Sequence, residues 1–297
     1  MLLIDAKMLA HATKHATVGT DMSEVQVLNG MLHGYLLRVL DLLLLYPVHR
    51  PLFFWDGHKW AAKNQRKSTT LLRSQVFPDY KQGREVADEP KWFTNAFEYS
   101  TLLIEVALRE IGFSNHFEED GYEADDLIAV MSRELTIAGK QSIIVSTDKD
   151  LYQLLGPMVI QHNPLSGKMM TDEYLMQEFG VTPEQWPMVK ALMGDKGDNI
   201  PGIEHVGIKT ACGLVRGEPP RSKKHPVQSL ATMGAEHVAL VNRNLGLMKL
   251  PYPGTPVPDI RDDAFSFYNL LHTLEKNKLH FHLKSETLDK WRTALEI

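Results

Sequence analysis

The chain has 297 residues and a mass of 33.7 kDa, enough for one large domain or two modest ones with a substantial hydrophobic core. Hydrophobic residues make up 43% and charged residues 23%, a balance that excludes wholesale disorder. The 37 acidic residues outnumber the 32 basic ones, so the net charge of −5 excludes a uniformly basic nucleic-acid-binding coat but permits local basic patches. The single cysteine, Cys212, excludes an internal disulfide framework and is typical of a reducing compartment.

The N-terminal sequence favours a location in the cytoplasm. Residues 1–9 lack the charged start of a signal peptide and instead resemble a buried strand. The most apolar stretch, residues 36–46, is interrupted by Arg38 and Asp41 and is expected to be too short to span a bilayer. We therefore expect a cytoplasmic protein without a membrane partner.

Short apolar runs alternate with longer amphipathic segments over about the first 185 residues, which predicts an α/β domain. The predicted strands are residues 2–4, 52–55, 142–146 and 158–161, with a weaker candidate at 113–117.

Helices are predicted between these strands and after them. Ser23 and Gln26 form a capping-box pattern at the start of a helix over residues 24–46. A second helix is predicted to begin near Glu123 and to stop at Gly139. After Trp186 the strand pattern ends, and helices with intervening turns, a proline-rich loop and a last helix are expected.

Residues 57–84 carry an unusual excess of positive charge. They include seven basic residues and one acidic residue, Asp79, with three aromatic residues interleaved. One interpretation is a solvated surface, and the other is a surface that binds phosphate groups. The basic residues are Lys59, Lys63, Arg66, Lys67, Arg73, Lys81 and Arg84.

Acidic residues gather at the predicted ends of strands and at one helix start. Asp5, Asp56 and the pair in STDKD each follow an apolar strand, and three acids occur in GYEADDL. Residues beyond the carboxyl ends of parallel strands converge on the ligand crevice of an open α/β sheet. Each acid alone is also explained as a turn or capping residue, but together they favour Mg²⁺ or Mn²⁺, since no thiolate cluster is available for zinc.

The glycine-rich segment GDKGDNIPGIEHVGIKTA is a candidate clamp for a nucleic-acid backbone. Gly202 and Gly207 permit close approach of another backbone, and Lys209 lies at a predicted helix start. A plain helix–turn–helix packing unit is the alternative.

The motifs GYEADDL, STDKDLYQLL and MGDKGDNIPGIEHVGIKTA together resemble the 5′-nuclease (flap endonuclease) family. The similarity covers about residues 1–216, with a looser match at 240–250. It implies a PIN-like α/β nuclease core with a central, mostly parallel sheet, a helical arch and a helix–three-turn–helix region. The implied domains are a core over residues 1–186, with the arch at 57–91, and a clamp and C-terminal helical region over 187–297.

The same resemblance implies roles for individual residues. Lys81 and Arg84, in FPDYKQGR, would act near the scissile phosphate, and Tyr80 would lie beside a base. DNA contacts are further expected at Lys59, Lys63, Lys67, Gly202, Gly207 and Lys209. The carboxylates implied for a first metal are Asp5, Asp56, Glu123 and Asp125, and those for a second are Asp148, Asp150 and Asp198, with Asp126 and Asp195 in support. A potassium ion is implied at the clamp hairpin.

The sequence thus predicts a 5′–3′ DNA exonuclease or flap endonuclease that uses two Mg²⁺ or Mn²⁺ ions in DNA replication or repair. It would act as a monomer on 5′ ends, flaps or nicks, with any polymerase partner in trans. A PIN-type ribonuclease and a noncatalytic protein that binds forks or junctions are the alternatives. Cleavage assays on DNA flaps and single-stranded RNA separate the three.

Overall fold

The structure is a computed structural model of residues 1–297, and it describes all of them except residues 20, 62–64, 69–71, 83–88 and 221–226. For residues 58–61 and 65–68 only the backbone is described. Contacts divide the chain into two compact units, and each unit is assembled from separate stretches of sequence. Unit 1 contains Met1–Trp55, Val86–Phe117 and Pro258–Ile297, and unit 2 contains Asp56–Glu85 and Glu118–Val257.

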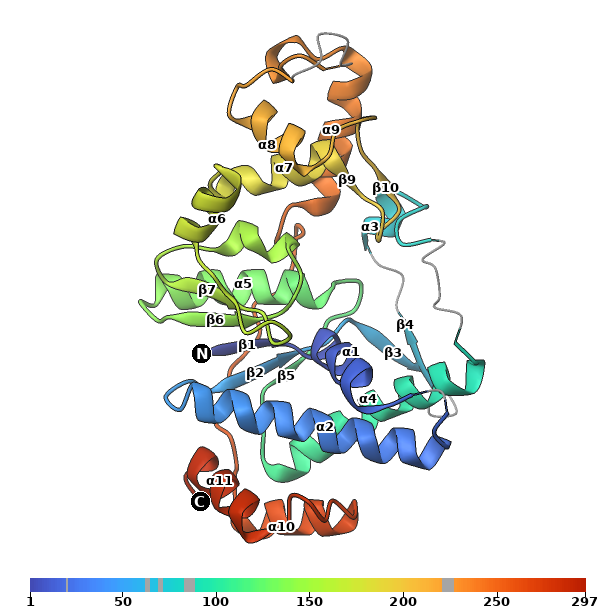
Figure 1. Ribbon diagram of the computed structural model, residues 1–297, viewed down its shortest axis with the longest axis vertical. Coiled ribbons are helices and arrows are strands. Elements are labelled where there is room, and N and C mark those ends of the chain that lie inside the picture. Colours follow the sequence, from blue (N-terminus) through green and yellow to red (C-terminus); the bar gives the residue numbers. More distant parts are fainter. Residues whose placement is uncertain (20, 62–64, 69–71, 83–88, 221–226) are drawn as a thin grey trace. The chain divides into compact units, whose positions relative to one another are not determined.

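Unit 1 combines parallel strands with long helices (Figure 1). The strand β1 pairs with β2 in parallel, and β2 pairs with β5 in parallel. The elements of unit 1 are β1 (Leu2–Asp5), α1 (Ala6–Thr17), α2 (Glu24–Leu45), β2 (Pro51–Phe54), α4 (Lys91–Ile111), β5 (His116–Phe117), α10 (Phe267–Lys276) and α11 (Ser285–Leu295).

The two longer strands of unit 1 confirm the strands predicted from the sequence. Every residue of β1 and of β2 is buried, and the register places Leu2 opposite Pro51 and Asp5 opposite Phe54. Continuous apolar runs of this kind are typical of parallel strands that are covered on both faces. The carboxyl ends of both strands therefore lie at the same edge of this part of the sheet.

Helix α2 confirms the predicted capping box but is longer than its most apolar stretch suggested. Ser23 N–H donates to Gln26 Oε1 (2.8 Å), and Gln26 N–H donates to Ser23 Oγ (3.4 Å). By length and composition this helix would be long enough to cross a membrane, which corrects the expectation drawn from residues 36–46. Helices α1, α4 and α11 pack against it, and 56% of its most apolar window is buried, as in the core helix of a folded domain.

The last 40 residues belong to unit 1, which differs from the single region expected over 187–297. Helix α10 packs against α4, and α11 packs against α2, with Leu270, Leu274 and Trp291 buried. The connection is also held by polar contacts, since Ser114 N–H donates to Asp263 Oδ1 (2.8 Å). The apolar faces of the two C-terminal helices therefore complete the core of unit 1.

Unit 2 contains the remaining strands and a group of shorter helices (Figure 1). Its elements are β3 (His58–Ala61), β4 (Gln65–Ser68), α3 (Leu72–Val76), α5 (Ala124–Ile137), β6 (Ser142–Val145), the 3₁₀ helix η1 (Asp150–Leu154), β7 (Val159–His162), β8 (Met169–Met170), α6 (Asp172–Phe179), η2 (Pro183–Gln185), α7 (Trp186–Met193), β9 (Gly194–Asp195), β10 (Ile200–Pro201), α8 (Ile208–Val215), η3 (Leu230–Thr232) and α9 (Ala235–Met248).

Among its described strands, unit 2 contains one parallel pair, and its other pairs are antiparallel. β6 pairs with β7 in parallel, and the short β8 pairs antiparallel to β7. The predicted strands at 142–146 and 158–161 and the predicted helix after Glu123 are therefore confirmed. Both units thus show the mixed α/β class that the sequence predicts, with parallel pairing in β1–β2–β5 and in β6–β7.

Helices α7, α8 and α9 form the end of unit 2 that carries the glycine-rich segment. The side chain of the buried Asn244 on α9 donates to Ala191 O and to Pro201 O, at 2.9 Å each. This amide fixes α9 against α7 and against a two-stranded hairpin, β9–β10. The hairpin corrects the expectation that strands end at Trp186, and α8 begins at Ile208, close to the predicted start.

In the segment expected to form a helical arch, residues 57–91, the described residues are partly helical and partly extended. Its helix α3 spans five residues, and the antiparallel pair β3–β4 precedes it, with His58 opposite Ser68. Antiparallel pairing satisfies the backbone polar groups of this stretch between neighbouring segments, so the stretch does not need a helix. Within the described residues of this segment α3 is helical, and the arch itself stays a prediction.

Candidate active site

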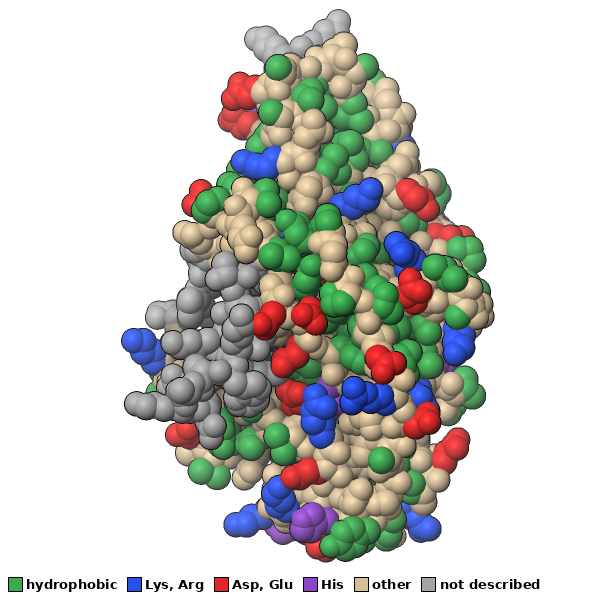
Figure 2. All heavy atoms as spheres, turned by 180° about the vertical axis from the view of Figure 1, so that it is seen from behind, with side chains coloured by type: hydrophobic (Ala, Val, Ile, Leu, Met, Phe, Trp, Pro, Cys, Tyr) green, Lys and Arg blue, Asp and Glu red, His purple; other side chains and the backbone are tan. Residues whose placement is uncertain are grey.

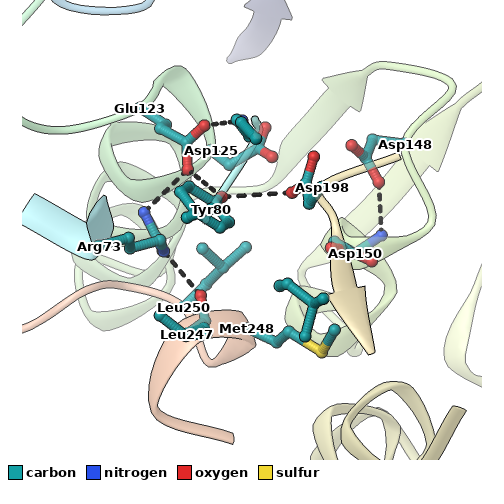
Figure 3. Close-up of a pocket in the computed structure, with 12 residues that line it drawn as sticks. Arg73, Tyr80, Glu123, Asp125, Asp148, Asp150, Asp198, Leu247, Met248 and Leu250 are labelled. Atoms are coloured by element: carbon teal, nitrogen blue, oxygen red, sulfur yellow. Dashed lines mark hydrogen bonds and ion pairs between the residues drawn. The ribbon is translucent and has the colours of Figure 1, made fainter. Parts of the chain in front are cut away.

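Five carboxylates line one small pocket within unit 2 (Figure 3). They come from the start of α5, from the loop after β6 and from the turn between β9 and β10. The cavity has a volume of about 50 Å³, so it has room for a few water-sized species but not for a nucleotide. The five are Glu123, Asp125, Asp148, Asp150 and Asp198.

The start of α5 separates its three acids into two groups. Glu123 is the N-cap residue, and its N–H donates to Asp126 Oδ2 (3.2 Å). Ala124 N–H donates to Asp56 Oδ1 (3.2 Å), so a fourth carboxylate lies at the same helix end. Negative charge is favoured there because the helix dipole is positive at its N-terminus. Glu123 and Asp125 line the pocket, whereas Asp126 is fully buried.

The carboxylate of Asp126 forms an ion pair with Arg73, which the sequence showed only as one member of the basic run. Arg73 Nη1 and Nη2 donate to the two carboxylate oxygens of Asp126 at 2.6 and 2.7 Å. Arg73 Nη1 also donates to Glu123 Oε2 (3.0 Å). Asp126 therefore has the two-pronged guanidinium contact of a buried structural ion pair rather than the exposure of a metal ligand.

The hydroxyl of Tyr80 is hydrogen-bonded to acids of the pocket, and its side chain is buried rather than exposed to a base. It is 5% exposed, and its hydroxyl lies 2.7 Å from Glu123 Oε2 and 3.2 Å from Asp198 Oδ2. Burial and the charge of Asp198 raise the pKa of Tyr80 well above its usual value, so the phenol is a hydrogen-bond donor. This arrangement departs from the expected role beside a base, because the ring packs with Ile200, Leu247 and Met248.

Lys81 places a second positive charge at Glu123, beside that of Arg73. Its Nζ pairs with Glu123 Oε1, and its backbone N–H donates to Asp198 O (2.8 Å). The backbone of Lys81 adopts a φ of 57°, in the left-handed region, which turns the chain sharply after Tyr80. The side chain is 24% exposed and lines the pocket together with the carboxylates.

On the other side of the pocket, one buried lysine is shared by two acids. Lys190 Nζ lies 2.7 Å from Asp150 Oδ1 and 2.7 Å from Asp195 Oδ2. Burial, followed by the charge of Asp148, raises the pKa of Asp150 to about 6, although Lys190 acts to lower it. Burial also opposes ionisation of Asp195, but its contacts with Lys190 outweigh burial and lower its pKa.

The donor set of the pocket fits a hard divalent cation. All five acids offer oxygen ligands, which Mg²⁺ and Mn²⁺ prefer. Burial and then the charge of Asp148 raise the pKa of Asp150, so a cation in the pocket would stabilise its ionised form. Across the part of the chain that the structure describes, no three acidic, histidine or cysteine side chains already form a metal cage. Two of the five carboxylates are paired with a lysine, Glu123 with Lys81 and Asp150 with Lys190.

Comparison with protein families identifies the chain. A family model described as the 5′–3′ exonuclease, N-terminal resolvase-like domain matches residues 1–180. The chain belongs to this exonuclease family. The resemblance that the three sequence motifs indicated is therefore confirmed.

Two curated relatives show how much of the chain the similarity covers. A 5′–3′ exonuclease of Aquifex aeolicus is 38% identical over 144 residues, which are 48% of this chain and 47% of the relative. The thermostable DNA polymerase I of Thermus thermophilus is 31% identical over 216 residues, which are 73% of this chain and 24% of the polymerase. The chain therefore spans about a quarter to a half of the length of these relatives.

Solved structures share the fold of the exonuclease family. The bacteriophage T5 5′-exonuclease with bound divalent metal ions (zinc) has a TM-score of 0.67 and 21% identity, and the match covers 100% of this chain and 98% of that one. The catalytic core of Rad2 in complex with a DNA substrate has a TM-score of 0.59 and 14% identity, covering 97% and 89%. These likenesses confirm the predicted PIN-like nuclease fold.

The remaining predicted acids have defined contacts in this exonuclease fold. Asp5 lies in unit 1, where its Oδ1 accepts from Met8 N–H (3.0 Å) as the N-cap of α1. Asp195 Oδ1 accepts from Asp198 N–H (3.2 Å), which supports the turn that carries Asp198. The metal roles of Asp5 and Asp56 stay predictions.

The predicted DNA contacts are described to different extents. Gly207 and Lys209 are exposed at the start of α8, whereas Gly202 packs against the backbone of Met193. Lys59 and Lys67 lie in β3 and β4, whose side chains are not described, and Lys63 and Arg84 lie outside the described residues. On the face drawn in Figure 2, the described Lys and Arg side chains are interspersed with Asp and Glu and form no broad basic patch.

Sequence reasoning missed three residues that hold the site together: Arg73, Lys190 and Gln153. Gln153 Nε2 donates to Asp150 O (2.8 Å) and to Met248 O (3.0 Å). A signal was present for Lys190, since a lysine within the apolar helix MVKALM needs a buried partner. Arg73 lies in a basic run, so its sequence context did not distinguish it from an exposed basic residue.

Proposed function

We propose that the chain is a structure-specific 5′–3′ nuclease that hydrolyses phosphodiester bonds of DNA at 5′ ends, flaps or nicks. The single observation that supports this most is the pocket itself. It combines five carboxylates with Lys81 in a chain of the 5′–3′ exonuclease family.

The carboxylates divide into two candidate ligand groups. Glu123 and Asp125, from α5, would hold one divalent metal with Asp56 of the same unit, and the role that the family resemblance implies for Asp5 stays a prediction. Asp148, Asp150 and Asp198 would hold the second. When bound, the metals supply positive charge that activates a water and stabilises the leaving oxygen of an in-line displacement.

The chain itself supplies charge and orientation at the reacting phosphate. Lys81 stabilises the negative charge that develops there, because its ammonium group lies at the pocket wall in a partly dry environment. The exposed start of α8, with Gly207 and Lys209, binds the adjacent duplex through its phosphates. Contacts to phosphates alone give specificity for structure without specificity for sequence.

The test is Asp125→Asn, assayed on a 5′-labelled flap and on a nicked duplex, with and without Mg²⁺. Cleavage should be lost while duplex affinity is kept, since neutralising an acid removes no phosphate contact. Asp289→Asn, at an exposed position on α11, is the matched control and should cleave like the wild type.

Cleavage by Asp125→Asn at the wild-type rate in Mg²⁺ would contradict the metal assignment. Wild-type protein that cuts single-stranded RNA but no DNA flap would instead identify a PIN-type ribonuclease. Binding to forks without any metal-dependent cleavage would identify a noncatalytic protein.

Further parts of this proposal rest on the family resemblance. Relatives named 5′–3′ exonuclease and DNA polymerase I support a role in DNA replication or repair, with a polymerase acting in trans. The choice of Mg²⁺ or Mn²⁺, a potassium ion at the clamp hairpin, the monomeric state and the cytoplasmic location stay predictions.

A further inference from the structure

Arg73 is buried at the pocket, and each of its three side-chain nitrogens donates a hydrogen bond. Besides its contacts with Asp126 and Glu123, Arg73 Nε donates to the backbone oxygen of Leu247 (2.6 Å). The ring of Tyr252 covers the guanidinium group, with 4.8 Å between the guanidinium carbon and the ring centroid. The side chain is 3% exposed, so it is not available to bind a phosphate from solution.

The residues that follow α9 tie this arginine to both sides of the pocket. We call residues 247–252 the strap. Tyr252 N–H donates to Asp126 Oδ1 (2.8 Å), and Leu250 N–H donates to Gln153 Oε1 (2.9 Å). The strap is therefore hydrogen-bonded both to the Arg73–Asp126 pair and to Gln153, whose side chain holds the backbone of Asp150.

Two effects of Arg73 on a metal at Glu123 oppose each other. Its positive charge repels a cation, but its hydrogen bond fixes the orientation of the carboxylate. Asp126 makes a two-pronged, fully buried pair with Arg73, so the pair is close to neutral as seen from the pocket. The orienting effect is therefore the larger one. Arg73 holds Glu123 Oε2 and leaves Oε1, which Lys81 contacts, as the oxygen that a cation can take.

We propose that Arg73 is a positioning residue that fixes Glu123 for divalent-metal binding by anchoring this carboxylate to Asp126 and to the strap. This inference rests on the proposed nuclease function for the identity of the ligand. A planar guanidinium is required, because one ammonium group cannot reach Asp126, Glu123 and Leu247 O in the same geometry.

The experiment measures Mn²⁺ binding to the DNA-free protein by electron paramagnetic resonance. The variants are Arg73→Lys, Arg73→Gln and the double variant Arg73→Gln/Asp126→Asn, with Arg133→Lys and Arg133→Gln as controls at an exposed position on α5. Thermal unfolding and cleavage of a 5′-labelled flap over a range of Mn²⁺ concentrations are recorded for each.

Arg73→Lys should raise the Kd for Mn²⁺ by about 10- to 100-fold, as substitutions of groups that orient metal ligands do. Added Mn²⁺ should restore part of the cleavage, and the Arg133 variants should match the wild type. The double variant replaces the buried ion pair by two neutral amides, so it should regain thermal stability relative to Arg73→Gln while its Mn²⁺ binding stays weak.

An unchanged or lower Kd in Arg73→Lys would overturn the positioning role. A double variant that regains wild-type stability and wild-type Mn²⁺ affinity together would also overturn it, because Arg73 would then be purely structural. If Arg73→Gln does not fold, the Kd values for Mn²⁺ of Arg73→Lys and of the double variant test the positioning role. Wild-type protein that binds Mn²⁺ but cleaves no DNA would overturn the nuclease function alone.

Discussion

Lys81 competes with any metal for the same carboxylate oxygen, because its Nζ pairs with Glu123 Oε1. A lysine at this position has two opposite consequences. It weakens metal binding by occupying a ligand, and it stabilises negative charge on a phosphate in the pocket. The two consequences are separable by experiment.

We expect Lys81→Ala to bind Mn²⁺ about fivefold more tightly, since one unit charge at about 4 Å in water contributes about 1 kcal/mol. The single-turnover cleavage rate should nevertheless fall by about 100-fold or more, as for removal of one preorganised charge from an active site. Mn²⁺ titrations and single-turnover rates on a 5′-labelled flap measure the two effects.

Lys140→Ala is the control for this change, because Lys140 is exposed beyond the end of α5. Wild-type cleavage by Lys81→Ala would remove Lys81 from the mechanism. Weaker rather than tighter Mn²⁺ binding would show that Lys81 supports Glu123 instead of competing for it.

At this scale, the sequence predicts the acids of the site well but not their partners. Glu123, Asp125, Asp148 and Asp150 are recognisable because they follow a strand or open a helix, and Asp198 is recognisable from the family motif that contains it. Which basic residue neutralises which acid depends on tertiary packing between distant segments. Arg73 and Asp126, 53 positions apart, are an example, and no local pattern reports their contact.

The two glycines of the clamp segment differ in what surrounds them. A Cβ on Gly202 would lie 2.1 Å from Met193 O and 2.5 Å from Gly194 N, so the β9–β10 hairpin needs glycine for its own packing. A Cβ on Gly207 would meet nothing within 4 Å. A DNA backbone can therefore approach Gly207 closely. Gly202 is explained by packing within the hairpin and needs no DNA contact to account for it.

We expect Gly202→Ala to lower the free energy of unfolding by about 3 kcal/mol through overpacking. Gly207→Ala should cost no more than about 1 kcal/mol, the loss from a poorer helix cap. Urea unfolding measures both, and fluorescence anisotropy with a labelled duplex measures DNA affinity at matched folded fractions. Gly207→Ala should weaken duplex affinity whatever the sequence of the duplex, and unchanged affinity would argue against a phosphate contact at this position.

Helices with clear caps are foreseen at the scale of elements, and others are not. Helix α2 carries a capping box, and α5 combines acids at its start with apolar spacing. Helices α1 and α4 were not predicted, although Gly112 ends α4 in the left-handed conformation and Asp5 caps α1. In the sequence, Asp5 is equally well explained as the end of a strand, and the basic run before residue 91 gives no cap pattern that marks the start of α4. The pair β3–β4 has no alternating apolar pattern that would predict it.

At the scale of the whole molecule, the buried His282 makes the free energy of unfolding depend on pH. His282 is fully buried in unit 1, and its Nδ1 accepts from the indole N–H of Trp291 (3.2 Å). Its other ring nitrogen therefore carries the proton and donates to His33 O (3.2 Å). Burial lowers the pKa of His282 to about 4, from 6.5 when exposed.

The unfolded chain binds a proton at this histidine below about pH 6.5, whereas the folded chain binds it only near pH 4. The stability that the neutral form contributes is therefore present above pH 6.5 and is lost as the pH falls toward 4, at up to about 1.4 kcal/mol per pH unit. In urea unfolding from pH 7 to 5, His282→Gln should lose stability less steeply than the wild type.

His280→Gln, at an exposed position two residues away, serves as the control and should keep the wild-type slope. Equal slopes for His282→Gln and the wild type would show that this histidine does not titrate on unfolding.

The discontinuous make-up of unit 1 also determines the order in which the two units become complete during synthesis. All of unit 2 lies before Pro258, whereas unit 1 lacks α10 and α11 until the last 40 residues have emerged from the ribosome. The pocket carboxylates of unit 2 can therefore assemble early. At that stage unit 1 still exposes the apolar surfaces of α2 and α4 that the C-terminal helices later cover. A chain truncated after residue 257 would keep every carboxylate of the pocket but would lack the two helices that complete the core of unit 1, so we expect it to expose apolar surface and to aggregate.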